Sequence, residues 1–196
     1  MKNVQTIYSL KELHNLLEKH VDLKKLILFL DLDLTLIQED EQDSCRDKLI
    51  EPQVTKDMFK FLHDNKVWYQ FVTARFHDVI CNQRKRVAYL EEIKQNIEDL
   101  YVVFEEMGID CSSYKNNKNE EMEVIKNDRG KTVGVIFKGI LLSDKKGELI
   151  KHFRLKYGLH NSHPHVIFVD DLIPYLRGVR KHLPNSICLQ RCIPEG

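Results

Sequence analysis

The chain contains the stretch Leu26-Ile27-Leu28-Phe29-Leu30-Asp31-Leu32-Asp33-Leu34-Thr35, in which an unbroken apolar run ends in two aspartates. A short run with no polar residue is typical of a strand that is buried on both faces of a parallel sheet. A strand of that kind needs helices on either side. The stretch therefore predicts an α/β fold with its acidic residues at the carboxyl end of a central strand.

The same pattern of an apolar run followed by polar residues occurs twice more. Residues 67–72 precede Thr73-Ala74-Arg75, and residues 165–169 precede Asp170-Asp171. A last strand is predicted at 186–193. Helical patterns at 10–20, 54–61, 79–107, 146–158 and 174–183 alternate with these runs. Alternation of strands and helices predicts a doubly wound, mainly parallel sheet with helices on both faces.

The length and charge of the chain limit its organisation and its partners. At 196 residues it fits one domain, residues 1–196, in which 109–143 form a small β-hairpin insertion that either edges the sheet or makes a lid. Thirty basic residues balance thirty acidic ones, which indicates neither a nucleic-acid nor a membrane-surface protein. The longest apolar stretch, 26–37, is shorter than the roughly 20 residues of a membrane helix. With no secretory signal visible, the default expectation is a cytoplasmic protein.

Polar side chains at the ends of parallel strands meet at one edge of the sheet. The sequence therefore predicts a cluster of Asp31, Asp33, Thr73, Asp170 and Asp171. Four carboxylates at close range raise one another's pKa unless a cation compensates them. Oxygen ligands of this type suit Mg²⁺, which usually pairs with a substrate phosphate.

These residues resemble the motifs of the haloacid dehalogenase superfamily of phosphatases. The run from Asp31 to Thr35 matches its DxDxT signature, Thr73 resembles the hydroxyl of motif II, Lys146 before a helix resembles the lysine of motif III, and Asp170-Asp171 resembles motif IV. The motifs occur in the family's order over residues 26–171. The resemblance implies a Mg²⁺-dependent phosphatase that works through an aspartyl-phosphate.

The resemblance also implies a role for each residue. Asp31 is the nucleophile and a metal ligand. Asp33 is the general acid and base, and its backbone carbonyl is a metal ligand. Asp170 binds Mg²⁺ directly, while Asp171 holds metal-bound water or the lysine.

Three side chains are expected to bind the substrate phosphate, and each has an alternative. Thr73 hydrogen-bonds the phosphoryl oxygens or caps the following helix. Lys146 offsets the negative charge, with Lys145 as the competing choice. Arg75 binds phosphate through two nitrogens or lies on the surface.

Other functional classes fit the sequence less well. A dehalogenase needs neither the second aspartate nor a metal. A response-regulator receiver places its acidic pair at the first strand, followed by a separate phospho-acceptor. A small-metabolite phosphatase and a catalytically inactive binding module on the same fold stay open as alternatives.

The expected substrate class follows from the short segment that is available for a cap over the site. Only about thirty residues, 37–66, separate the first two motifs, so the fold has little or no cap. Open members of the superfamily tend to act on macromolecules, so we expect a phosphoprotein substrate, with phosphotyrosine as one candidate. The pair Lys146-Gly147 and the run Val169-Asp170-Asp171 also loosely resemble poorly characterised bacterial members, some of which are effectors that intracellular pathogens deliver into host cells.

Overall fold

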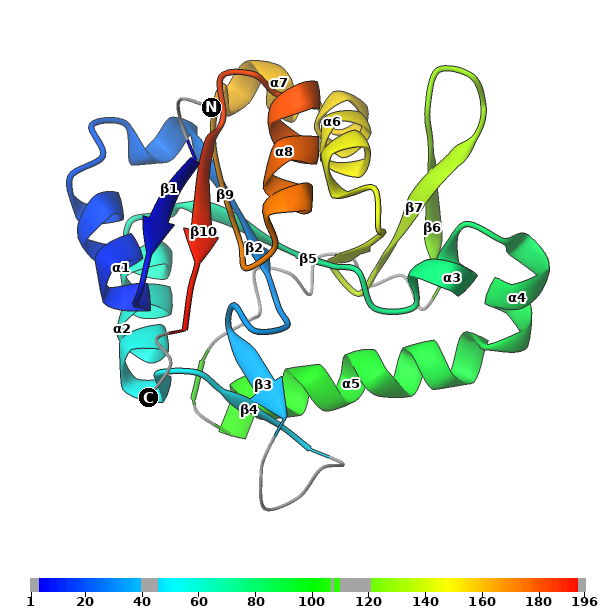
Figure 1. Cartoon of the computed structure of the whole chain (residues 1–196), viewed down its shortest axis with the longest axis horizontal. Coiled ribbons are helices and arrows are strands. Elements are labelled where there is room, and N and C mark those ends of the chain that lie inside the picture. The colour runs from blue at the N-terminus through cyan, green and yellow to red at the C-terminus, as the bar shows by residue number, and fades with distance from the viewer. Residues whose placement is uncertain (1–3, 40–45, 107, 110–120, 194–196) are drawn as a thin grey trace.

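The computed structural model describes residues 4–39, 46–106, 108–109 and 121–193. In this part of the chain the architecture is α/β, with a mostly parallel central sheet of eight strands in the order β1-β10-β9-β2-β5-β8-β7-β6 (Figure 1). Neighbouring strands from β1 to β8 are parallel, whereas β7 is antiparallel to both β8 and β6. The expected mainly parallel sheet is confirmed at this level.

The strands of the sheet are β1 (Val4–Ile7), β2 (Leu26–Asp31), β5 (Trp68–Thr73), β6 (Glu123–Lys126), β7 (Thr132–Phe137), β8 (Ile140–Leu142), β9 (His165–Asp170) and β10 (Ile187–Arg191). A separate antiparallel pair is made by β3 (Ile37–Glu39) and β4 (Asp47–Leu49). The helices are α1 (Leu10–Glu18), α2 (Pro52–Asp64), α3 (His77–Ile80), α4 (Gln83–Ala88), α5 (Leu90–Glu106), α6 (Lys146–Lys156), α7 (Leu159–Ser162) and α8 (Ile173–His182), with a 3₁₀ turn at Leu23–Lys25.

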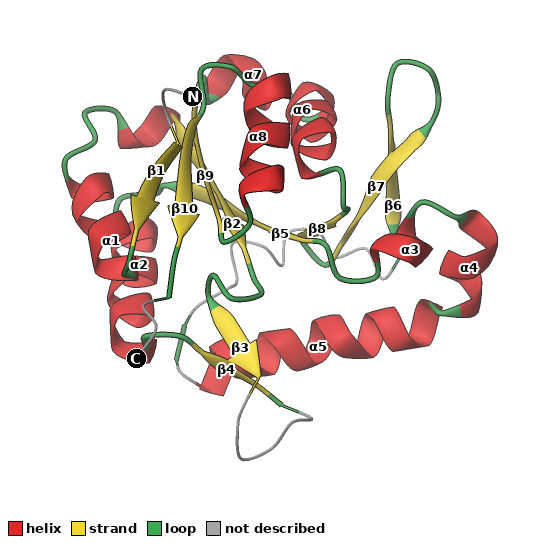
Figure 2. Cartoon of the chain, viewed as in Figure 1, coloured by secondary structure: helices red, strands yellow, loops and turns green. Residues whose placement is uncertain are grey.

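Side chains of β2 alternate between two cores, one on each face of the sheet. Leu28 and Leu30 belong to the core that α1, α2 and α5 complete, whereas Ile27 and Phe29 belong to the core that α6, α7 and α8 complete (Figure 2). Every residue of β2 is buried, as expected of a strand covered on both faces. Because successive side chains point to opposite faces, β2 contributes to both cores, and it lies between β9 and β5 with Asp31 as its last residue.

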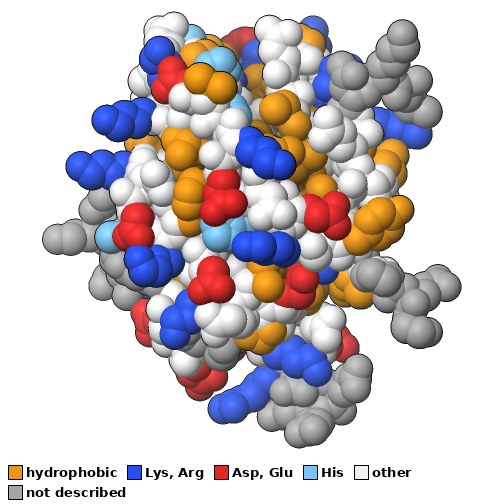
Figure 3. All heavy atoms as spheres, turned by 90° about the vertical axis from the view of Figure 1, so that its left-hand side faces the viewer, with side chains coloured by type: hydrophobic (Ala, Val, Ile, Leu, Met, Phe, Trp, Pro, Cys, Tyr) orange, Lys and Arg blue, Asp and Glu red, His pale blue; other side chains and the backbone are white. Residues whose placement is uncertain are grey.

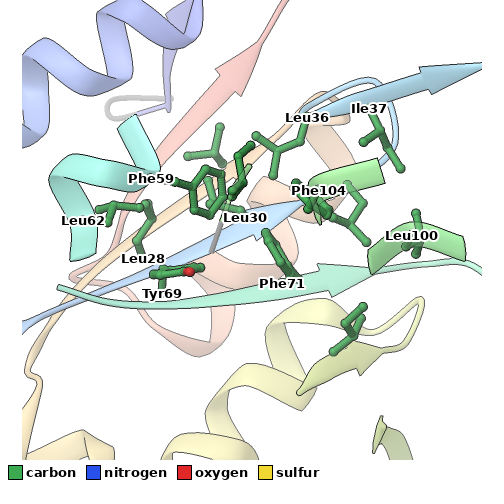
Figure 4. Packing of buried hydrophobic residues seen from close by; sticks show 14 of the residues in the cluster. Leu28, Leu30, Leu36, Ile37, Phe59, Leu62, Tyr69, Phe71, Leu100 and Phe104 are labelled. Carbon is green, nitrogen blue, oxygen red and sulfur yellow. The ribbon is translucent and has the colours of Figure 1, made fainter. Parts of the chain in front are cut away.

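An aromatic cluster holds α5 against the sheet. The rings of Phe71 on β5 and Phe104 on α5 stack with their centroids 5.0 Å apart, and Phe59 of α2 packs on both (Figure 4). Gly108, with φ of 66°, ends this helical segment as the sequence indicated. The other end of α5 extends below the sheet in Figure 1, on the side to which the arrowheads of β1 and β10 point. Helix α5 therefore passes along the carboxyl edge of the sheet.

The helical region predicted at 79–107 consists of three helices, α3, α4 and α5. It starts at His77, and Asn82 caps α4 by accepting a hydrogen bond from the backbone N–H of Lys85. The sequence left two alternatives for 109–143, an edge of the sheet or a lid. The described strands of this segment, β6, β7 and β8, form the edge of the main sheet. The polar segment expected at 110–119 lies outside the described residues.

One face of the molecule carries both signs of charge side by side (Figure 3). Figure 3 shows Lys and Arg side chains interspersed with Asp and Glu on the face that looks left in Figure 1. In the part of the chain that the structure describes, no helix has the length and apolar character needed to cross a membrane.

Candidate functional site

Two aspartates end adjacent strands of the sheet and share one lysine. Asp31 closes β2 and Asp170 closes β9, and the pairing of Leu30 with Val169 brings the two strand ends level. Lys146, the first residue of α6, places its Nζ 2.5 Å from Asp31 Oδ1 and 2.7 Å from Asp170 Oδ2. All three side chains are at most 4% exposed. The site is thus a buried triad of two carboxylates and one ammonium group.

Asp171 adds a third carboxylate to this triad. Carboxylate oxygens of Asp31, Asp170 and Asp171 lie within 4.8 Å of one another. Burial raises the pKa of Asp31 to about 7, against the attraction of Lys146. Burial likewise raises the pKa of Asp170 and of Asp171. Burial alone would lower the pKa of Lys146, but the charges of Asp31 and Asp170 raise it above its usual value, so this lysine stays charged at neutral pH.

The donor set fits a hard divalent cation. With all groups ionised, three carboxylates and one ammonium group leave two negative charges in a largely buried site, which a divalent cation balances. The three side chains that could coordinate the ion all offer carboxylate oxygens, the ligands that Mg²⁺ prefers. Asp31, Asp170 and Asp171 are therefore the residues that can hold such an ion.

A second group of side chains surrounds Asp33, two residues beyond Asp31. Arg75 Nε lies 2.9 Å from Asp33 Oδ1 and 3.1 Å from Oδ2, and Arg75 Nη2 lies 2.5 Å from Oδ1. The hydroxyl of Thr73 donates to Asp33 Oδ2 at 3.2 Å and accepts from the backbone N–H of Arg75 at 3.1 Å. The side chain of Asp33 is 45% exposed, so part of it is open to solvent while Arg75 and Thr73 hold its carboxylate in place.

Each sequence-predicted site residue therefore lies at the carboxyl edge of the sheet, in one of these two groups. Of the two lysine candidates, Lys146 makes the contacts to the carboxylates, while Lys145 precedes α6 as its N-cap residue. The alternative role of Thr73 as a helix cap is wrong, because α3 starts at His77 and its N-cap residue is Phe76. Arg75 is not a free surface residue, since its side chain is only 18% exposed and binds two carboxylates.

Sequence reasoning missed four residues that complete these groups. Thr35 is fully buried and its hydroxyl donates to Asp31 Oδ2 at 3.2 Å. Its position as the threonine of the DxDxT signature could have marked it as a site residue. The ring of Tyr175 on α8 lies 4.3 Å from Lys146 Nζ. Asp47 on β4 accepts from Arg75 Nη2 at 2.9 Å, and Asn96 on α5 accepts from Arg75 Nη1 at 3.2 Å. No local pattern marks these last three residues, because their contacts join segments that are far apart in the chain.

Comparisons of this chain with protein-family models, with curated proteins and with solved structures found no match. The functional argument therefore depends on the geometry and chemistry of the residues themselves.

Proposed function

We propose that this protein is a Mg²⁺-dependent phosphatase of the haloacid dehalogenase type, which hydrolyses a phosphate monoester through an aspartyl-phosphate on Asp31. The observation that carries the proposal is the position of Lys146 Nζ, 2.5 Å from Asp31 Oδ1 and 2.7 Å from Asp170 Oδ2 in a buried site. A buried lysine between two carboxylates, with a third carboxylate beside them, supports a centre that handles phosphate and a cation together.

Asp31 acts as the nucleophile in this proposal. One of its carboxylate oxygens attacks the phosphorus, a new O–P bond forms, and the bond from phosphorus to the ester oxygen breaks. The hydrogen bond from Thr35 to Oδ2 and the contact from Lys146 to Oδ1 fix the orientation of the carboxylate. A fixed orientation supports catalysis because the reacting atoms are already aligned.

Asp33 acts as the general acid and then as the general base. It gives a proton to the departing ester oxygen, and it later takes a proton from the water that attacks the phosphorus and releases Asp31. Arg75 and Thr73 hold its carboxylate from one side while 45% of the side chain stays exposed. This arrangement leaves Asp33 accessible to a leaving group that arrives from solvent.

Asp31, Asp170 and Asp171 would hold the magnesium ion, which supplies positive charge to the phosphoryl oxygens when bound. Lys146 adds a fixed positive charge that no pH change near neutrality removes, because its carboxylate neighbours raise its pKa. The positive charges of the magnesium ion and Lys146 would thereby offset the negative charge of the phosphate and Asp31.

A phosphoprotein is the proposed substrate class. The small antiparallel pair near the site has strands of only three residues each, Ile37–Glu39 and Asp47–Leu49, and β6 to β8 extend the main sheet. The partial exposure of Asp33 supports an open approach for a bulky substrate.

The test is turnover of phenyl phosphate with Mg²⁺ or with a chelator, for the wild type and for Asp31→Asn. Asn keeps the shape of the side chain and removes the nucleophile. Asp57→Asn is the matched control, because Asp57 is an exposed residue of α2 whose carboxylate accepts a hydrogen bond from Gln53 on the same helix. Magnesium-dependent turnover in the wild type and the control, lost in Asp31→Asn, is expected. Absence of wild-type turnover on aryl, peptide and sugar phosphates contradicts the proposal and favours the inactive binding module.

A further inference from the structure

The ammonium group of Lys146 has three neighbours. It donates to Asp31 Oδ1 at 2.5 Å and to Asp170 Oδ2 at 2.7 Å. Its Nζ also lies over the ring of Tyr175, 4.3 Å from the ring centre. An ammonium group has three N–H donors, and the two carboxylates take two of them. The aromatic face is therefore the third neighbour of this buried charge.

The packing of α8 on α6 brings the ring to this position. Gly147 of α6 lies so close to α8 that an added Cβ atom would be 2.2 Å from the carbonyl oxygen of Gly178 and 2.7 Å from the backbone nitrogen of Val179. Tyr175 precedes these two residues of α8 by three and four positions, and residues at that spacing share a face of a helix. Tyr175 therefore lies on the face of α8 that meets α6, where Lys146 is the first residue.

The ring of Tyr175, and not its hydroxyl group, makes the contact with the lysine. In the described part of the chain the hydroxyl has no hydrogen-bond partner, whereas the ring is partly buried against the core on the α6 and α8 side of the sheet. The face of an aromatic ring is negative and attracts a cation within about 6 Å of its centre, most strongly where water is excluded. The lysine side chain is 1% exposed, so the attraction acts in such a place.

Water would compete for the third N–H of Lys146 if the ring were absent. Lysine has a flexible four-carbon chain, and its ammonium group is strongly hydrated. A water molecule in place of the ring would offer the ammonium group another acceptor and another orientation. The ring attracts the charge without offering such an acceptor. It therefore favours the position between Asp31 and Asp170.

We propose that Tyr175 is a positioning residue, whose aromatic face keeps the ammonium group of Lys146 against Asp31 and Asp170. The catalytic consequence rests on the proposed function. Lys146 then acts on the phosphoryl group as a fixed charge beside Asp31, and its third N–H stays on the ring instead of binding the substrate. This role requires an aromatic ring but no hydroxyl group on it.

Replacement of Tyr175 by Phe and by Leu separates the aromatic face from apolar bulk. With phenyl phosphate and Mg²⁺, Tyr175→Phe should keep kcat within about twofold of the wild type, whereas Tyr175→Leu should lower it about tenfold with little change in KM. Tyr89→Leu is the control, because Tyr89 is 46% exposed at the end of α4, and both constants should stay unchanged. A Tyr175→Phe variant as slow as Tyr175→Leu, or a rise in KM alone, contradicts the inference.

Fluorinated phenylalanines at position 175 test the electrostatic attraction at nearly constant shape. Each fluorine withdraws electrons from the ring face, so kcat should fall stepwise from phenylalanine to the trifluorinated ring, by about tenfold in all. If only the packing of the ring mattered, kcat would stay the same across the series, and the inference would be overturned.

A double-mutant cycle with Lys146→Met supplies a test that needs no enzymatic activity. Tyr175→Leu should lower the equilibrium constant for folding about tenfold more in the wild-type background than in Lys146→Met, which has no ammonium group for the ring to hold. Urea unfolding in chelator at one pH measures both effects. Equal effects in the two backgrounds contradict the inference and leave the phosphatase standing. Absence of wild-type turnover contradicts the phosphatase, whereas a coupling in this cycle still supports Tyr175 as the residue that positions Lys146.

Discussion

Arg75 binds the carboxylate of Asp33 through two nitrogens, with Nε 2.9 Å from Oδ1 and Nη2 2.5 Å from the same oxygen. The same guanidinium donates to Asp47 on β4 and to Asn96 on α5. Its donors are therefore directed at protein groups. This arrangement favours a role in positioning Asp33 over the alternative in which Arg75 binds the substrate phosphate.

Replacement of Arg75 by Ala is expected to lower kcat by about 10- to 100-fold with little change in KM, on the scale of an impaired general acid or base. The reason is that Asp33 loses its bidentate partner, whereas no phosphate contact is lost. Steady-state kinetics with phenyl phosphate measure the two constants separately. Asn96→Ala, which removes one neutral hydrogen bond to the same guanidinium, is the control and should change kcat much less. A rise in KM at constant kcat would instead indicate that Arg75 binds phosphate.

Replacement of Lys146 by Met is expected to destabilise the protein by about 3–5 kcal/mol at neutral pH, as when one partner of a buried ion pair is removed. Asp31 and Asp170 then lack their cation in a buried site. Urea unfolding measures the loss, which should shrink toward pH 5 as the two carboxylates take up protons. Lys145→Met is the matched control, because its Nζ makes no contact with these carboxylates in the described structure. Equal effects of the two substitutions would contradict the assignment of Lys146.

The raised pKa of Asp31 predicts how the metal-free protein depends on pH. An aspartate has a pKa of 3.8 when unperturbed and about 7 here, because of burial. Between these values the folded state keeps a proton that the unfolded state has lost, so rising pH favours unfolding. The free energy of unfolding of the wild type, relative to Asp31→Asn, should therefore fall from about pH 4 to about pH 7 by on the order of a few kcal/mol.

Urea unfolding in chelator from pH 4.5 to 8 measures this difference. Addition of Mg²⁺ should stabilise the wild type most at the upper end of the range, where Asp31 can ionise, and should stabilise Asp31→Asn less. If the free energies of unfolding of the wild type and Asp31→Asn stay parallel across the pH range, the predicted pH dependence of Asp31 is contradicted. An equal response of both proteins to Mg²⁺ would contradict the predicted linkage between Asp31 and the metal.

The sequence indicated the central elements because their signals are local. The apolar runs before Asp31 and Asp170 identify buried strands, and the rule that parallel strands meet at one edge brings their ends together. The strand Val4–Ile7 and the pair Ile37–Glu39 with Asp47–Leu49 were not predicted. They are three or four residues long and lack a clear apolar alternation, so only their pairing partners reveal them.

The site residues were predictable where they belong to these local elements, and not where they depend on packing between distant segments. Residues that end strands or begin a helix, such as Asp31 and Lys146, follow from the element pattern and the family motifs. Asp47, Asn96 and Tyr175 depend on how β4, α5 and α8 pack around the carboxyl edge, which no short stretch of sequence encodes. The chemistry assigned to these residues stays a prediction.

Gly147 allows α6 and α8 to approach each other closely next to Lys146. A Cβ atom added at Gly147 would lie 2.2 Å from the carbonyl oxygen of Gly178 and 2.7 Å from the backbone nitrogen of Val179. Both contacts involve backbone atoms, so the helices must separate to accept the methyl group. In Figure 1 the two helices lie side by side. Because α6 carries Lys146 as its first residue, its displacement moves the lysine away from Asp31 and Asp170.

Gly147→Ala is therefore expected to destabilise the protein by about 1–3 kcal/mol, the scale of overpacking in a close-packed interior, and to lower turnover as well. Gly178→Ala is the matched control, because a Cβ atom there meets no atom within 4 Å. Alanine is favoured over glycine in a helix by about 1 kcal/mol, so this variant should be as stable as the wild type or more stable. Urea unfolding of both variants measures the contrast. A lower free energy of unfolding for Gly147→Ala, with an equal or higher one for Gly178→Ala, supports close helix packing as the reason for glycine at 147. A stabilising effect of both substitutions would show that α6 moves aside without penalty.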